Sequence, residues 1–394
     1  MTERLYRDDP YLLEFEARVV SRREHEGRPA VVLDRTAFYA ESGGQPWDTG
    51  TIGGVPVVAV LENGEDVLHV LAAPLAAERV EGRVDAERRR DHREQHHGQH
   101  LLSRAFVQVA RAPTVSFHLG AEQSTIDLDR GVTSEQVRDA ETLANEVVWE
   151  ARPVAVRTVS RAEALALGLT PPAEAGDAVR LVEAADFDRQ PCGGTHPRST
   201  AEVGVVIVLG HERYKGGSRV RFVCGHRALS VVRARNVVLE RLGTLFSSPP
   251  EGLPDAATRA LESLAEANRR GAELLERALD GEARRLLAEA GGGLVAALYD
   301  GWPAADLRSL ALRLVALAPC VALLGSRSEK AHLVFAQSEG LGHDIPGLLR
   351  AAVLTVGGRG GGKGNLAQGG GDRPDRLDEA LAAATAAIRG RAYP

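Results

Sequence analysis

The sequence contains few cysteines, few aromatic residues and no long apolar run. Its 394 residues include three cysteines, one methionine and 4% aromatic residues. A sparse, odd set of cysteines behind an N-terminus that does not resemble a signal peptide excludes a disulfide framework, and predicts a reducing, cytoplasmic location. No apolar run approaches the length of a membrane span, so the sequence predicts a soluble protein.

An excess of positive charge is also missing. The formal net charge of −6 argues against a generally basic nucleic-acid-binding surface, although local basic patches remain compatible with it. The length is typical of roughly two to four domains, and 44% hydrophobic residues suffice for ordinary cores. Local basic clusters are found at 88–93, at 211–221, and at Arg359, Lys363 and Arg373. Each cluster is either an ordinary solvated surface or a contact for RNA.

What the sequence does contain is histidine in a regular arrangement. Residues 88–106 have the periodicity of a helix, in which His96 and His100 occupy one face because they are four residues apart. The neighbouring His97 would point about 100° away around the helix. We therefore take His96, and not His97, as the candidate metal ligand that pairs with His100.

A second pair has the same spacing but a different local structure. Cys192 and His196 flank a Gly-Gly turn, so turn geometry would place them. Three imidazoles and one thiolate together favour zinc in a near-tetrahedral site. Each pair taken alone is more often an ordinary solvated pair, and the residues by themselves leave that interpretation open.

The segments predict a multidomain α+β fold. Residues 1–87 hold short β-type runs separated by turns and predict a small β-barrel. Residues 88–227 predict a two-layer α+β domain, with helices at 88–106 and 134–151 and strands near 114–129, 154–159, 179–183, 203–209 and 218–224. Residues 228–290 predict a helical spacer broken at 247–252, and residues 291–394 an α/β domain.

Two features of the second half have alternative interpretations. The leucines of the spacer favour either a helical hairpin packed on its own chain or a coiled-coil-like segment that pairs two subunits. The glycine-rich residues 357–371 are either a flexible linker or a phosphate-binding nest beside Arg359, Lys363 and Arg373. They do not form a Walker loop, because Lys363 is followed by Gly364.

Five motifs resemble, in order, those of alanyl-tRNA synthetase editing regions and of the free-standing AlaX proteins in their long form. Residues 36–50 are similar to TxFYPxSGGQxxDxG, 95–102 to the HTAxHLL helix and 357–371 to GGxGGGxxxxAQGGG, while 192–196 are identical to CGGTH. SFHLG at 116–120, followed by STIDL, fits the same domain. The chain departs from the usual pattern at Ala40, His97 and Gly98, where Pro, Thr and Ala are common.

The resemblance implies an activity and roles for residues. It implies zinc-dependent hydrolysis, in trans, of tRNA(Ala) mischarged with serine or glycine, with zinc held by His96, His100, Cys192 and His196. A zinc-bound water would attack the ester, and Gln45 is a candidate to orient it. Implied substrate contacts are Thr36, Gly43, Gly44 and Gln45; implied tRNA contacts are Arg359, Lys363 and Arg373. A homodimer through the C-terminal half is also implied.

Other functions are weighed against this one. Four protein ligands would close a tetrahedral shell, whereas catalytic zinc normally keeps an open position. A non-catalytic tRNA-binding module with structural zinc therefore stays an alternative. A loosely held fourth ligand would instead leave a position open for catalysis. A DHH phosphoesterase is disfavoured, because Asp91-His92-Arg93 is the only near match to its acidic motifs. A complete synthetase is disfavoured because the chain has no room for activation and anticodon-facing regions.

Overall fold

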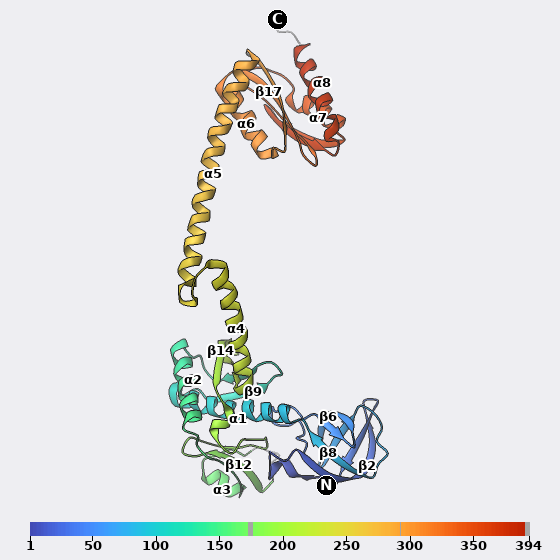
Figure 1. Cartoon of the computed structure of the whole chain (residues 1–394), viewed down its shortest axis with the longest axis vertical. Helices are drawn as coiled ribbons and strands as arrows, with labels where there is room; N and C mark the ends of the chain where they lie inside the picture. The colour runs from blue at the N-terminus through green and yellow to red at the C-terminus, as the bar shows by residue number, and fades with distance from the viewer. Residues whose placement is uncertain (172–175, 292, 391–394) are drawn as a thin grey trace. The chain divides into compact units, whose positions relative to one another are not determined.

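The computed structural model describes residues 1–171, 176–291 and 293–390. The chain divides into two compact units, Met1–Arg241 and Leu242–Pro394, and each is considered by itself. Both mix helices with sheets, which confirms the predicted α+β class (Figure 1). Among the described residues, no helix has the length and apolarity needed to cross a bilayer.

The first unit begins with the predicted β-barrel. Its strands close in the order β2-β3-β7-β6-β5-β8, all pairing antiparallel, around a core that includes Leu33, Phe38 and Val60. The barrel strands are β2 (Glu14–His25), β3 (Arg28–Leu33), β5 (Gly50–Ile52), β6 (Val55–Asn63), β7 (Asp66–Leu71) and β8 (Arg79–Val84). Two short strands, β1 (Glu3–Arg4) and β4 (Arg35–Thr36), pair parallel beside it, and the 3-10 turn η1 (Leu5–Arg7) follows β1.

The predicted histidine helix is α1 (Ala86–Ala110), and most of it is buried. Asp85 caps it by accepting hydrogen bonds from the backbone of Glu87 and Arg88. Gly98 lies where α1 packs most closely on the neighbouring sheet, since a Cβ built there would be 2.2 Å from the Cys224 sulfur. Residue 98 is glycine where alanine is common, and the side chain of Cys224 occupies the space that the alanine methyl group would take.

Residues 88–227 form two sheets, where the sequence predicted one two-layer domain. The larger sheet has the order β14-β15-β10-β9 and packs against α1 and α2 (Ser134–Trp149). A separate antiparallel sheet, β11-β12-β13, carries the short helix α3 (Arg161–Ala166). Period-two patterns identify strands but not their partners, so the sequence does not predict how the strands divide between sheets. The strands are β9 (Thr114–Leu119), β10 (Ser124–Leu128), β11 (Val154–Ser160), β12 (Ala178–Ala184), β13 (Asp188–Pro191), β14 (Val206–Tyr214) and β15 (Gly217–Cys224); η2 is Thr200–Val203.

Helix α4 (Gly225–Phe246) is tied to α1 at its first turn and crosses the boundary that the sequence predicted at residue 227. Glu94 on α1 accepts hydrogen bonds from the backbone N–H and the ring Nδ1 of His226, at 2.9 and 2.7 Å. Arg227 makes two hydrogen bonds to Asp91, at 2.6 and 2.5 Å. These charge-assisted contacts hold the first turn of α4 on α1.

The second unit starts at Leu242, within α4, and the break that the sequence predicted at 247–252 contains η3 (Pro250–Gly252). Helix α5 (Leu253–Ala290) packs its last turns on α6 (Ala304–Leu317), while Leu261, Leu264 and Leu275 on its earlier turns are exposed. A five-stranded sheet, β16-β17-β18-β20-β19, has α6 on one face and α7 and α8 on the other (Figure 1). The elements are β16 (Gly293–Asp300), β17 (Cys320–Arg327), β18 (Ala331–Gln337), α7 (Ile345–Thr355), η4 (Pro374–Arg376) and α8 (Leu377–Arg389).

The glycine-rich segment is neither a linker nor a nest. It forms a β-hairpin of β19 (Gly358–Lys363) and β20 (Leu366–Gly371), in which β20 pairs with β18 and with β19, and β19 is the edge strand of the sheet. Glycine is required because the strands and α7 approach closely: a Cβ on Gly369 would be 2.7 Å from Val353. Gly357 and Gly364, with φ of +68° and +65°, need glycine for their backbone conformation.

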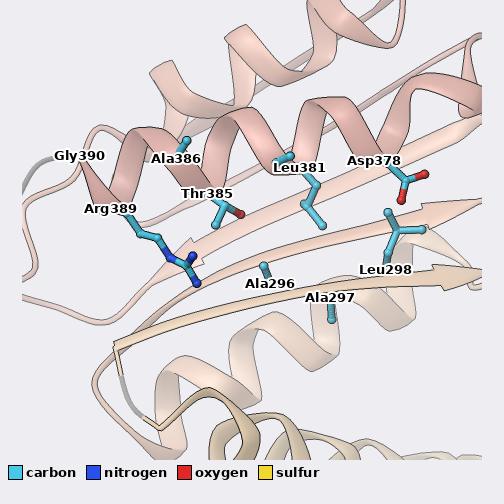
Figure 2. Close-up of a pocket in the computed structure, with 10 residues that line it drawn as sticks. Ala296, Ala297, Leu298, Asp378, Leu381, Thr385, Ala386, Arg389 and Gly390 are labelled. Atoms are coloured by element: carbon cyan, nitrogen blue, oxygen red, sulfur yellow. The ribbon is translucent and has the colours of Figure 1, made fainter.

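A cavity of about 730 Å³ opens in the second unit between the edge strand β16 and α8. Ala296 and Ala297 form its floor, and Leu381, Thr385 and Arg389 line the helix side (Figure 2). Its described lining includes none of the site residues that the sequence predicted.

Candidate metal centre

The structure brings the four predicted ligands together at one point. Their ligand atoms all lie within 4.8 Å of one another, and the group could hold a metal ion. His96 and His100 come from one face of α1, while Cys192 and His196 come from the turn after β13. Three of the four are buried and Cys192 is partly buried. The helical spacing predicted by the sequence therefore produces the expected cluster.

The donor set fits zinc. A tetrahedral zinc with Zn–N near ~2.0–2.1 Å and Zn–S near ~2.3 Å requires ligand atoms roughly 3.3–3.6 Å apart. The Cys192 sulfur lies 3.4 Å from Nε2 of His96 and 3.2 Å from Nε2 of His196. Both histidines thus direct Nε2 towards the thiol, as ligands of one ion would.

Each imidazole is held from behind through its Nδ1 atom. The side-chain oxygen of Gln45 lies 2.8 Å from Nδ1 of His96, and a carboxylate oxygen of Asp188 lies 3.2 Å from Nδ1 of His100. Nδ1 of His97 lies 3.1 Å from Nδ1 of His196. Such partners fix the ring orientation and leave Nε2 unprotonated for a metal. In this arrangement, His196 donates from Nδ1 to His97.

The charges of the cluster also suit a metal. Although burial opposes ionisation, the surrounding imidazoles hold the pKa of Cys192 well below its usual range, which favours the thiolate form that a metal binds. Burial lowers the pKa of His196 to about 3, so that this ring is neutral at physiological pH. Burial disfavours the charged form of His100 too, but hydrogen bonds to Asp188 and Cys192 raise its pKa to about 10. A bound cation would take the place of that proton.

The cluster lies in the wall of a cavity of about 1200 Å³. The cavity is lined by the loop after β4, by α1, by β9 and by the β12–β13 sheet. Tyr39 and Phe117 provide aromatic walls, and Gly43 and Gly193 provide bare backbone. A cavity of this size and mixed polarity admits a small molecule or the end of a larger one.

The loop that contains Gly43, Gly44 and Gln45 contacts this site from the barrel side. Gly44 lies so close to the ring of Phe117 that an added Cβ would be 2.7 Å from it. Gln45 is fully buried. Its side-chain amide nitrogen donates to the hydroxyl of Thr195 at 3.0 Å, and its side-chain oxygen accepts from the backbone N–H of Thr195 at 3.1 Å. Gln45 thus contacts the candidate ligand His96 and, at Thr195, the turn that carries Cys192 and His196, a role that the sequence did not predict.

Thr36 lies elsewhere in the barrel. It is fully buried, and its hydroxyl lies 2.8 Å from Nε2 of His69. His69 donates from Nδ1 to the Val31 carbonyl, and burial lowers its pKa to about 4, so that the neutral ring accepts the hydroxyl proton. Thr36 is not among the residues that line the described cavity.

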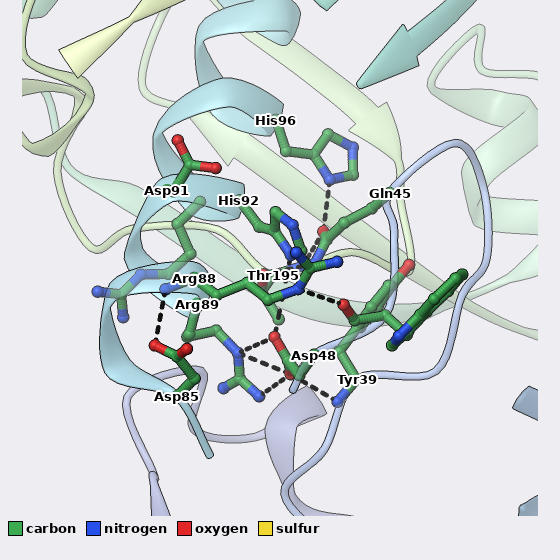
Figure 3. A network of polar contacts seen from close by, with 12 residues as sticks. Tyr39, Gln45, Asp48, Asp85, Arg88, Arg89, Asp91, His92, His96 and Thr195 are labelled. Atoms are coloured by element: carbon green, nitrogen blue, oxygen red, sulfur yellow. Dashed lines mark hydrogen bonds and ion pairs between the residues drawn. The ribbon is translucent and has the colours of Figure 1, made fainter. Parts of the chain in front are cut away.

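A buried ion pair supports the loop that carries Gln45. Arg89 on α1 is 1% exposed and Asp48 is 0% exposed, and they bond at 2.5 Å (Figure 3). Asp48 also accepts a hydrogen bond from the Tyr39 backbone, at 2.7 Å. Arg89 additionally bonds the carbonyl of Ala37. The pair therefore clamps both ends of the loop onto the helix that carries His96.

Sequence reasoning missed three of these residues. Asp188 stands in an unremarkable Asp-Phe-Asp run, and only the β12–β13 pairing brings it to His100. His97 was set aside because it points away from His96, yet that direction brings it to His196. Arg180 binds the backbone carbonyls of Cys192 and Gly194, at 2.7 and 3.0 Å.

Two family models match the chain. The model described as threonyl and alanyl tRNA synthetase second additional domain matches residues 179–221. The DHHA1 domain model matches residues 291–390. The first match covers β12 to β15 and the CGGTH turn, and the second covers nearly all of the second unit after α5.

Similar curated proteins match most of the chain. The alanyl-tRNA editing protein AlaX-L of Pyrococcus horikoshii is 30% identical over 385 residues, which is 94% of each chain. The alanine–tRNA ligase of Thermococcus kodakarensis is 33% identical over 96% of this chain and 43% of that ligase. The solved C-Ala domain of Aquifex aeolicus alanyl-tRNA synthetase is 29% identical, with a TM-score of 0.22, over 23% of this chain and 85% of that domain.

Proposed function

Because the chain belongs to the AlaX-L family and is homologous to the editing and C-terminal regions of alanyl-tRNA synthetase, we propose that it is an aminoacyl-tRNA hydrolase acting in trans. Its substrate is tRNA(Ala) mischarged with serine, and also with glycine. The observation that carries this proposal is the cluster of four ligands in the wall of a cavity. An aminoacyl ester is already activated, so its hydrolysis needs little beyond a positioned water and a Lewis acid.

The residues of the chain divide the work. His96, His100, Cys192 and His196 would hold zinc, which supplies a Lewis acid that polarises a carbonyl and lowers the pKa of water. Asp188, Gln45 and His97 keep the rings in place. Gln45 gives one amide hydrogen to Thr195, and we assign its second amide hydrogen to the orientation of water. Of the four ligands, we take one to be loosely held, which leaves room for substrate.

The test compares substrates and metal states. Purified protein is incubated with Ser-tRNA(Ala), Gly-tRNA(Ala) and Ala-tRNA(Ala), before and after a chelator removes metal. We expect rapid deacylation of the first two, little of the third, and recovery on adding Zn²⁺. Tight binding of all three without hydrolysis would instead favour the non-catalytic tRNA-binding module.

Selectivity against alanine requires a partner for the serine hydroxyl, and we assign it to Thr36. A site built around a hydroxyl rejects the analogue that lacks one, because its own polar groups are left unpaired. We expect Thr36→Val to reduce the preference for Ser-tRNA over Ala-tRNA by about 1–3 kcal/mol, measured as the ratio of kcat/KM values. Thr36→Ser, which keeps the bond to His69, is the control. An unchanged ratio in Thr36→Val would limit Thr36 to the barrel core.

Contact with the body of tRNA is assigned to the second unit. Arg359 and Lys363 are exposed on one face of the edge strand β19, and Arg373 follows the hairpin and pairs with Asp375 at 3.5 Å. Phosphate contacts release counterions, at about one unit of salt slope for each contact. The double variant Arg359→Ala/Lys363→Ala should therefore weaken tRNA binding and reduce its salt slope by about two. Arg308→Ala, an exposed arginine on α6, is the control; an unchanged slope in the double variant would rule these contacts out.

The exposed leucines of α5 are assigned to a second copy of the chain. Leu261 and Leu264 are 68% and 57% exposed, one turn apart. An apolar stripe of this kind is covered in a stable protein. We expect sedimentation analysis to give a dimer for the unaltered chain and a monomer for Leu261→Glu/Leu264→Glu. A dimer that persists in this variant would place the interface elsewhere.

A further inference from the structure

The cavity beside the ligand cluster has more positive than negative side chains. Five arginines line it: Arg4, Arg7, Arg104, Arg180 and Arg189. Its lining contains two carboxylates, and both are engaged within the protein. Glu62 bonds Arg4 at 2.7 Å, and Asp188 bonds His100 at 3.2 Å. Part of the positive charge of this cavity is therefore not neutralised by the residues that line it.

Arg180 is the arginine closest in structure to the metal ligands. Its Nη1 donates to the carbonyls of Cys192 and Gly194, which places the guanidinium directly against the ligand turn. Its Nε and Nη2 atoms are buried and make no hydrogen bond to any described residue. A buried donor without an acceptor is costly, and a charged one more so. Arg180 thus has two unused donors beside the metal centre.

Arg7 lines the same cavity from the side of the β-barrel. It is exposed at the end of η1, beside the barrel, and no described residue accepts a hydrogen bond from it or pairs with its charge. Burial lowers the pKa of Arg180, and the two guanidinium groups line one cavity. Two like charges held in one cavity favour an anion between them.

We propose that Arg180 and Arg7 bind the 5′-phosphate of the terminal nucleotide of the aminoacylated RNA. This assignment deepens the proposed function and rests on it. The ester and that phosphate are attached to the same ribose, so an ester carbonyl at the ligand cluster brings the phosphate into the same cavity. A guanidinium fork suits a phosphate, because its parallel N–H donors match two oxygens.

The other arginines are less suited to this role. Arg4 and Arg189 already pair with Glu62 and Glu183, and Arg104 donates to the Phe187 carbonyl. Arg7 makes no hydrogen bond or ion pair with any described residue, so its replacement should leave the fold intact. Arg18, exposed on β2 and absent from the cavity lining, offers a matched control in the same unit.

The experiment measures binding to the full-length, zinc-loaded protein by calorimetry. The probes are 3′-deoxy-3′-serylamido-adenosine and its 5′-monophosphate, whose amide is not hydrolysed as an ester. We expect the phosphate to tighten binding by about tenfold in the unaltered protein. In Arg7→Ala this gain should fall to about twofold, while Arg7→Lys and Arg18→Ala keep most of it. All four proteins should bind the unphosphorylated probe equally.

A second variant addresses Arg180. Arg180→Lys retains a donor for the ligand turn but lacks the fork, so it should keep its zinc and lose most of the phosphate gain. The proposal is overturned if the unaltered protein gains nothing from the phosphate, or if Arg7→Ala and Arg180→Lys both keep the full gain. If the gain depends on Arg7 but seryl-tRNA is not hydrolysed, the phosphate site stands and the proposed hydrolase activity fails.

Discussion

Replacing Cys192 with alanine is expected to remove bound metal and to reduce deacylation of seryl-tRNA by about a thousandfold or more. The thiolate is the one anionic ligand of the cluster, and it lies within 3.4 Å of two ligand nitrogens. Lewis-acid stabilisation contributes several kcal/mol, and each 1.36 kcal/mol corresponds to about a factor of ten in rate. Elemental analysis and single-turnover deacylation of the purified variant measure the two effects.

Two further variants make this result specific. Cys320→Ala removes a buried thiol of the second unit and should keep full metal content and activity. Asp188→Asn loosens His100 without removing a ligand, and should weaken metal affinity by about 10–100-fold. A Cys192→Ala protein that retains one metal per chain and normal activity would contradict the assignment of the ligands.

The second large effect concerns stability. Asp48→Ala should destabilise the first unit by about 3–5 kcal/mol, because it leaves the guanidinium of Arg89 buried without its counter-charge. The exposed pair of Asp129 and Arg130 provides the contrast: Asp129→Ala should change stability by less than about 1 kcal/mol.

Urea unfolding can follow the first unit alone. Trp47 lies in the barrel and donates to the Val58 carbonyl at 3.0 Å, so its fluorescence reports on that unit once Trp149 and Trp302 are replaced by phenylalanine. Because the ion pair holds the loop of Gln45 on α1, metal affinity should fall together with stability. Equal midpoints for Asp48→Ala and the unaltered protein would show that the pair contributes little.

The ligands were predictable because their spacing is a local property. Four residues on a helix bring His96 and His100 to one face, and the Gly-Gly turn brings Cys192 and His196 together. Asp188 and Arg180 were not predictable, since only strand pairing places them beside those ligands. Local patterns predict which side chains share one face of a helix or turn. Tertiary contacts determine which residues from distant segments lie beside them.

The glycine hairpin was mispredicted for a related reason. Glycine has low strand propensity, and β19 and β20 contain no apolar alternation that would predict a strand. The strands form because their backbones pair in the sheet and side chains of α7, such as Val353 and Leu349, pack directly against the bare glycine backbone. Only the tertiary packing distinguishes this segment from a flexible linker.

The contact between Gly98 and Cys224 also restricts the order in which this lineage could change. An alanine at residue 98, common in the related HTAxHLL helix, would overlap the sulfur of Cys224, 2.2 Å from its Cβ. A smaller residue at 224 must therefore come first, and on its own it leaves a void against α1. Each single substitution therefore disturbs this contact, whereas the two together need not. The two positions would thus be inherited together, and chains with alanine at 98 should have a small residue at 224.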